Sequence, residues 1–156
     1  MSTDYAKILK VLVTNGVDFV VIGGVAANLH GSARVTFDLD LVYSRQPSNL
    51  TNLARALHPY HPYLRGAPPG LPFTFDDAAL KNGLNFTLDT ALGDVDLLGE
   101  VVGGGNFEQL LPHTIEVQAF GVSCKCVSLE RLNATETSRR APQRSGVDRR
   151  VASVIG

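Results

Sequence analysis

Cysteine is scarce in this chain of 156 residues, which has two, separated by a single residue. So few cysteines provide no disulfide framework, and a reducing cytoplasm is the expected compartment. Cys124 and Cys126 share one face of a predicted strand and are expected to be small buried side chains. No apolar run is long enough to span a bilayer, and the first ten residues lack the apolar stretch of a secretory signal. We therefore expect a cytoplasmic protein with no membrane partner.

The chain also lacks a large excess of charge of either sign. It has 14 Lys and Arg against 15 Asp and Glu, a formal net charge of -1. This balance argues against a protein whose whole surface binds nucleic acid, but it does not exclude a local basic patch. Hydrophobic residues make up 44% of the chain, enough to bury a core in one domain. We expect that domain over residues 1–132 and an Arg-rich, poorly packed tail over residues 133–156.

Hydrophobic periodicity predicts that helices and strands are mixed along the chain. Helices are predicted over residues 4–15, 25–30, 49–58 and 106–111. Strands are predicted over residues 18–22, 35–43, 84–89, 94–98, 115–120 and 122–127. Residues 59–72 are rich in Pro and Gly and are predicted to form a loop. Because the last two strands form a hairpin, the pattern indicates an α+β fold with a mixed β-sheet flanked by helices.

The strongest chemical signal is the pair Asp38 and Asp40 on the predicted strand 35–43. Side chains two positions apart on a strand point to the same face, so the two carboxylates lie close together and repel each other. A divalent cation relieves that repulsion, and Mg²⁺ prefers such oxygen ligands. The alternative is a solvated strand face that carries two unrelated acids.

Gly23 and Gly24 follow the buried strand 18–22 and precede a predicted helix. Without side chains, this bend lets phosphate oxygens approach the backbone N–H groups at a helix start. The alternative is a tight turn that needs glycine. A phosphate cradle one strand before an acidic pair is more specific, because a nucleotide–Mg²⁺ complex requires both.

A second Asp-x-Asp motif, Asp94 and Asp96, lies on a later predicted strand. Asp94 is interpreted as a turn residue after Gly93, which leaves Asp96 as a candidate ligand. A third carboxylate beside the first pair would allow two Mg²⁺ ions to be held.

These motifs occur in an order that resembles a known group of proteins. The segments that carry the resemblance are VVIGGVA at 20–26, HGS at 30–32, Arg34, Thr36, DLDL at 38–41, GLNFT at 83–87, GDVDLLG at 93–99, GGG at 103–105 and VSLE at 127–130. Together they resemble small bacterial nucleotidyltransferase-like proteins of the DNA polymerase β-like superfamily, near the AbiEii toxin and minimal nucleotidyltransferase groups. The resemblance spans about residues 15–132.

The resemblance implies a nucleotidyltransferase fold and a role for each matching residue. It implies a nucleotide-binding set of Gly23, Gly24, Arg34 and Thr36. It implies a catalytic, metal-binding set of Asp38, Asp40 and Asp96. Each of two residues has an alternative interpretation that stays open. Arg34 is then a partner in a surface ion pair, and Thr36 is a residue that simply fits the strand.

The implied activity is Mg²⁺-dependent transfer of a nucleoside monophosphate from a nucleoside triphosphate, such as ATP, to a hydroxyl of an RNA, a protein or a small molecule. The resemblance also implies a toxin–antitoxin setting with a cognate antitoxin as partner. The alternative is a catalytically degenerate protein that binds a nucleotide or a partner. The segment after residue 132 favours this alternative, because similar proteins carry a lysine-containing helix there and this chain has no Lys after Lys125.

Overall fold

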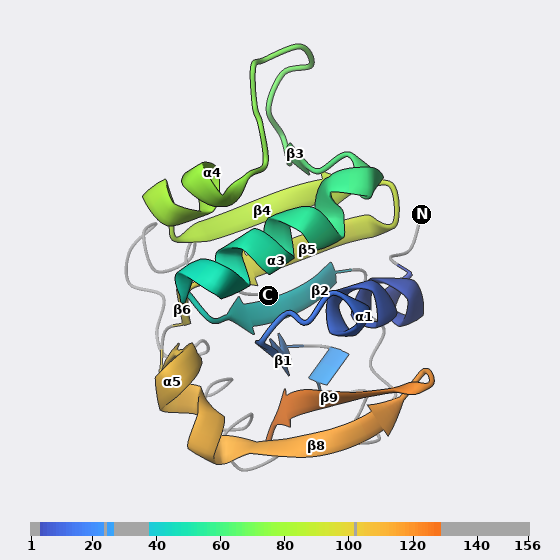
Figure 1. The fold of residues 1–156 in the computed structure, drawn as a ribbon, viewed down its shortest axis with the longest axis vertical. Helices are drawn as coiled ribbons and strands as arrows, with labels where there is room; N and C mark the ends of the chain where they lie inside the picture. The colour runs from blue at the N-terminus through green and yellow to red at the C-terminus, as the bar shows by residue number, and fades with distance from the viewer. Residues whose placement is uncertain (1–3, 24, 27–37, 102, 129–156) are drawn as a thin grey trace, which may run out of the picture.

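The computed structural model describes residues 4–23, 25, 26, 38–101 and 103–128 (Figure 1). Seven strands form one sheet: β1 (Phe19–Ile22), β2 (Asp38–Tyr43), β3 (Tyr63–Leu64), β4 (Asn85–Thr90), β5 (Gly93–Leu98), β8 (Thr114–Ala119) and β9 (Val122–Val127). Their order across the sheet is β3-β4-β5-β2-β1-β9-β8. Two further short strands, β6 (Glu100–Val101) and β7 (Gly105–Asn106), pair with each other.

The sheet contains both parallel and antiparallel neighbours, so the predicted α+β fold with a mixed sheet is confirmed. β1 runs antiparallel to β2 and parallel to β9, and β2 runs parallel to β5. The β4–β5 and β8–β9 hairpins are antiparallel, as is the edge pair β3–β4. The parallel pairing of β2 with β5 requires a long crossover, because parallel strands cannot be joined by a tight turn.

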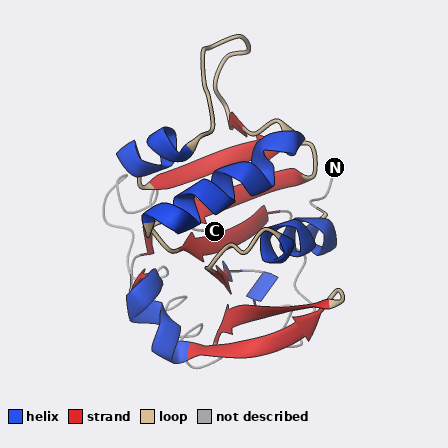
Figure 2. Ribbon diagram, in the orientation of Figure 1, coloured by secondary structure: helices blue, strands red, loops and turns tan. Residues whose placement is uncertain are grey.

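Two amphipathic helices, α1 (Tyr5–Thr14) and α3 (Pro47–Leu57), lie in front of the sheet in Figures 1 and 2. Asp4 caps α1 by accepting a hydrogen bond from the backbone N–H of Lys7 at 3.1 Å, as N-cap residues do. The buried side chains of the two helices belong to one hydrophobic core with the strands, and they are Ile8, Leu9, Leu12, Leu50, Leu53, Ala56 and Leu57. The structure also contains two shorter helices, α4 (Asp77–Asn82) and α5 (Phe107–Leu110).

A buried amide fixes α3 against the strands that lead to the candidate site. Asn49 accepts a hydrogen bond from the N–H of Asp18 at 2.6 Å and donates to the carbonyls of Asp18 and Ser44 at 3.0 and 2.8 Å. Asp18 immediately precedes β1 and Ser44 immediately follows β2. Because an unsatisfied buried amide is costly, these bonds hold the start of β1 and the end of β2 in one position.

The structure differs from the sequence-based expectation between residues 59 and 82. Part of the predicted loop 59–72 forms the 3₁₀ turn His58–Tyr60 and strand β3, and α4 was not predicted. A two-residue strand has no periodicity to detect, and β3 exists because β4 offers it a free edge to pair with. The expected tail 133–156, like a helix after Ser128, lies outside the described residues. None of the described helices is long and apolar enough to cross a membrane.

Candidate active site

The parallel pairing of β2 with β5 places the two Asp-x-Asp motifs in register. Asp38 is the partner of Asp94, and Asp40 is the partner of Asp96. Register partners on neighbouring strands point to the same face and lie roughly 5 Å apart across the sheet. The four residues therefore form a two-by-two group on one face, which we call the carboxylate array. Asp96 therefore lies on the same face of the sheet as Asp38 and Asp40, as expected for a third carboxylate beside the first pair.

The interpretation of Asp94 as a turn residue is wrong. Asp94 lies inside β5, paired with Asp89 of β4 as well as with Asp38 of β2. The turn between β4 and β5 ends before Gly93, which is itself the first residue of β5. Gly93 favoured a turn in the local sequence, but the pairing of β5 with strands on both sides extends the strand to it.

The array has a buried inner pair and a half-buried outer pair. The inner residues Asp40 and Asp96 are 2% and 0% exposed. The side chains of Asp38 and Asp94 at the outer end are 37% and 40% exposed. An open rim above a buried floor is suited to a ligand that enters from solvent and contacts the inner carboxylates last.

Burial raises the pKa of the Asp96 carboxyl above its usual value, although nearby Arg65 acts in the opposite direction. Burial and the neighbouring Asp89 also raise the pKa of Asp94, again against Arg65. The physical cause is the cost of keeping several negative charges close together and away from water. The array is therefore a place where added positive charge is strongly favoured.

Arg65, which directly follows β3, supplies positive charge to the array. Its Nη2 lies 2.9 Å from Asp96 Oδ1, and its Nη1 lies 3.8 Å from Asp38 Oδ2. Its Nε lies 3.6 Å from Asp94 Oδ2 and 3.3 Å from Asp89 Oδ1. Burial lowers the pKa of Arg65, but Asp96, Asp94 and Asp38 outweigh it, so the guanidinium stays charged. Sequence reasoning missed this residue; the available signal was a lone cation in a Pro/Gly-rich segment that precedes two acidic strands.

Gly23 lies directly beside the inner pair. It follows β1, where Ile22 is the register partner of Asp40. Its φ is +71°, and a Cβ on it would lie 2.2 Å from Asp40 Oδ2. No side chain fits at this position, so the bend at the end of β1 and the carboxylate array are in contact. Gly23 therefore lies beside Asp40 of the acidic pair, and its role as a phosphate ligand stays a prediction.

The other proposed nucleotide ligands cannot be placed. Gly24, Arg34 and Thr36 lie outside the described residues, as does His30. The described part of the site consists of Gly23, the carboxylate array and Arg65.

The donor chemistry of the array fits Mg²⁺. Carboxylate oxygens from two strands are the ligand type this ion prefers. Apart from the Arg65 ion pair, neither oxygen of Asp96 accepts a well-directed hydrogen bond within the described part of the chain. Among the same residues, however, no three His, Cys, Asp or Glu side chains gather as a metal-binding cluster. The donors are present, and the Arg65 guanidinium contacts one oxygen of Asp96 and one of Asp38.

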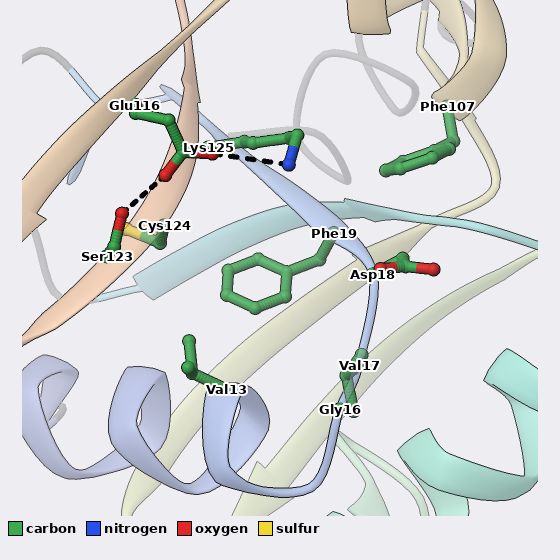
Figure 3. A pocket seen from close by; sticks show the side chains of 10 residues that line it. All are labelled: Val13, Gly16, Val17, Asp18, Phe19, Phe107, Glu116, Ser123, Cys124 and Lys125. Carbon is green, nitrogen blue, oxygen red and sulfur yellow. Dashed lines mark hydrogen bonds and ion pairs between the residues drawn. The ribbon is translucent and has the colours of Figure 1, made fainter.

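A separate cavity of about 240 Å³ lies at the opposite end of β1 (Figure 3). It is bordered by Asp18 and Phe19, and none of the four array residues lines it. Glu116 on its wall accepts a hydrogen bond from Ser123 and forms an ion pair with Lys125 Nζ at 3.2 Å. These polar groups satisfy one another, so the cavity does not extend the candidate active site.

Two comparisons with known proteins match this chain to proteins described as nucleotidyltransferases. Residues 1–54, about a third of the chain, match a family model described as "Nucleotidyl transferase of unknown function (DUF2204)". A crystal structure described as a "putative nucleotidyltransferase" from Thermotoga maritima superposes with a TM-score of 0.53 at 16% identity. The superposition covers 88% of this chain and 91% of that one. No curated protein matches the sequence. The chain has the nucleotidyltransferase fold, as expected from its motifs.

Proposed function

We propose that this protein is a Mg²⁺-dependent nucleotidyltransferase that moves a nucleoside monophosphate from a nucleoside triphosphate to a hydroxyl group. The observation that carries the proposal is the in-register pairing of Asp38 and Asp40 with Asp94 and Asp96 beside Gly23. The matched segment 1–54 contains Gly23, Asp38 and Asp40, which supports the assignment of this end of the sheet.

Different residues of the site would bind different parts of the Mg²⁺–nucleotide complex. Gly23 leaves room at the end of β1 where a side chain would collide with Asp40. Asp38, Asp40 and Asp96 are the residues that would hold Mg²⁺. When bound, Mg²⁺ would neutralise the triphosphate and lower the pKa of the attacking hydroxyl. Gly24, Arg34 and Thr36 stay proposed phosphate ligands, on the strength of the sequence motifs.

In the transfer itself, the acceptor oxygen forms a bond to the α-phosphorus while the bond from that phosphorus to the β-phosphate's bridging oxygen breaks. Pyrophosphate leaves with the electron pair, and the hydroxyl proton passes to solvent. In this proposal, Asp96 at the buried floor of the array orients the acceptor, and Asp38 at the rim contacts the triphosphate. The main contribution of the protein is positioning and electrostatic stabilisation, as in other phosphoryl transfers.

The acceptor, whether RNA, protein or small molecule, is not distinguished by the described residues, and a cognate antitoxin as partner stays a prediction from the resemblance. The site's exposed rim accommodates any acceptor that presents a hydroxyl group. A panel of acceptors is therefore part of the test.

A second function, a degenerate protein that binds a nucleotide or a partner without chemistry, is favoured by one observation. Arg65 already neutralises part of the array, with Nη2 at 2.9 Å from the most deeply buried carboxylate, Asp96. A permanent ion pair of this kind would leave no function for a metal.

The experiment is titration calorimetry with ATP and Mg²⁺, combined with an assay of pyrophosphate release across RNA, protein and small-molecule acceptors. We expect Mg²⁺-dependent ATP binding that is lost in the double variant Asp38→Ala/Asp40→Ala. The matched control is Glu100→Ala/Glu108→Ala, which removes two exposed acids away from the array. Absence of Mg²⁺-dependent nucleotide binding in the wild type would contradict both proposals. Binding with no pyrophosphate release from any acceptor would favour the degenerate function.

A further inference from the structure

Arg65 is anchored by its backbone at the edge of the sheet and reaches across the strands with its side chain. Its N–H donates to the carbonyl of Thr87 at 2.9 Å, and its Nη2 donates to the carbonyl of Leu88 at 3.0 Å. From this anchor on β4 the guanidinium comes within 4 Å of carboxylates on β4, β5 and β2. One side chain therefore links three neighbouring strands at the candidate site.

Arg65 contacts one oxygen on each of two proposed metal ligands, Asp96 and Asp38. A Mg²⁺ ion bound to Asp96 Oδ1 would lie about 2 Å from that oxygen. The guanidinium nitrogen lies 2.9 Å from the same oxygen and a second nitrogen lies 3.8 Å from Asp38 Oδ2. Two cations at such a separation repel strongly in a partly buried site. Arg65 in its observed position therefore opposes the binding of a metal ion to these two oxygens.

Withdrawal of the Arg65 guanidinium would break its hydrogen bond to the Leu88 carbonyl but would leave the bond from the Arg65 backbone N–H to Thr87 in place. Its side chain is 27% exposed, so the guanidinium has direct access to solvent. Its four carboxylate partners include the exposed Asp89 and the half-buried Asp94, whose interactions with it are partly screened by water. The contact with Asp96 is the one that is shielded, and Mg²⁺, with twice the charge, is the stronger competitor for it.

We propose that Arg65 is a displaceable counter-cation of the carboxylate array, which competes with Mg²⁺ for Asp38 and Asp96. The inference rests on the proposed function, because it assumes that the array is where the metal binds. It adds a regulatory property: metal entry is coupled to the departure of one side chain, and metal affinity is set below what the carboxylates alone would give.

Arg65→Gln removes the competing charge and keeps a polar side chain, although a shorter one than that of arginine or lysine. In this variant we expect Mn²⁺, used alone as a spectroscopic substitute for Mg²⁺, to bind about tenfold more tightly than in the wild type. Arg65→Lys keeps the charge on a shorter and less branched group, so its Mn²⁺ affinity should lie between the two. The matched control is Arg55→Gln on α3, where Arg55 contacts Asn52 at 2.8 Å and no array residue.

Free Mn²⁺ is measured by electron paramagnetic resonance in the absence of nucleotide, with Mg²⁺ competition as a second titration. The melting temperature is measured with and without Mg²⁺. Metal-free Arg65→Gln should melt below the wild type because Asp96 loses its counter-charge, and saturating Mg²⁺ should raise its melting temperature more than that of the wild type. Arg55→Gln should match the wild type in metal affinity and in the size of the Mg²⁺ shift.

Unchanged or weaker Mn²⁺ binding in folded Arg65→Gln overturns the inference. If Arg65→Gln does not fold, as judged by circular dichroism, unchanged Mn²⁺ affinity in Arg65→Lys overturns it instead. The outcome is separable from that of the proposed function. Pyrophosphate release by the wild type with no gain of metal affinity in the variants would leave the function and remove the inference. Tighter metal binding in the variants, with no transfer activity in the wild type or any variant, would support the inference and contradict the proposed function.

Discussion

Gly23 and Asp40 are in such close contact that the glycine cannot carry a side chain. A Cβ at Gly23 would lie 2.2 Å from Asp40 Oδ2 and 3.1 Å from the carboxyl carbon. The end of β1 and the middle of β2 are thus fitted to each other at the point where the acidic pair lies. This contact links the glycine motif to the carboxylate array through local geometry.

Gly23→Ala should therefore be destabilising for two separate reasons. The left-handed backbone at φ +71° costs roughly 1–2 kcal/mol for a non-glycine residue. Displacement of the buried Asp40 carboxylate adds a further loss. The measurement is the free energy of unfolding in urea, with metal affinity as a second reading.

Gly70→Ala is the matched control for that variant. Gly70 has a φ of +87°, but a Cβ on it meets nothing within 4 Å. The control should show the backbone cost alone and leave metal affinity unchanged. Equal losses of stability in the two variants would show that Asp40 moves aside without cost.

Asp38→Asn and Asp96→Asn should affect different steps of the proposed reaction. Asp38 is at the exposed rim and is expected to contribute mainly to binding of the Mg²⁺–nucleotide complex. Asp96 is at the buried floor, so Asp96→Asn should lower the transfer rate by about a hundredfold or more while it spares nucleotide affinity. The measurements are ATP affinity by calorimetry and the rate of pyrophosphate release.

The control for this pair is Glu108→Gln, which neutralises an exposed acid on α5. It should leave both measurements unchanged. Equal loss of ATP affinity in Asp38→Asn and Asp96→Asn would contradict the division of work between rim and floor.

The two cysteine thiols should be unreactive in the native protein. Burial raises the pKa of Cys126 to about 12, with a smaller contribution from Cys124, and burial also raises the pKa of Cys124. The thiolate is the nucleophilic form, so at pH 8 very little of either thiol can react. Iodoacetamide labelling followed by mass spectrometry should show two labels in denaturant and almost none in buffer. Rapid labelling of Cys126 in the native state would show that β9 opens readily.

Local pattern was sufficient for most of the central strands and for the two large helices. The alternation of Leu39 and Leu41 with Asp38 and Asp40 was enough to place both acids on one face. The buried positions Ile8, Leu9 and Leu12 follow the helical repeat that predicted α1. These features depend on residues a few positions apart, which is the range that periodicity describes.

Features made by pairing between distant segments could not be predicted in the same way. Asp94 is the first residue of the predicted strand 94–98 and was interpreted as a turn residue, because only the pairing of β5 with β2 and β4 shows that it lies beside Asp38 and Asp89. Arg65 was missed because β3 is two residues long and is defined by its partner β4. For Gly24, Arg34 and Thr36 the sequence motifs remain the basis of the assignment.

The sequence by itself determined the chemical character of the site: two acidic pairs on strands, each pair on one face, and a glycine bend after a buried strand. Only the tertiary structure decided that the two pairs lie in register and that Arg65 lies among them. The reason is that strand register and sheet order are set by packing of the whole core across a crossover of some fifty residues, from β2 to β5. A local pattern carries the direction of a side chain, but the identity of its neighbour depends on the folded chain as a whole.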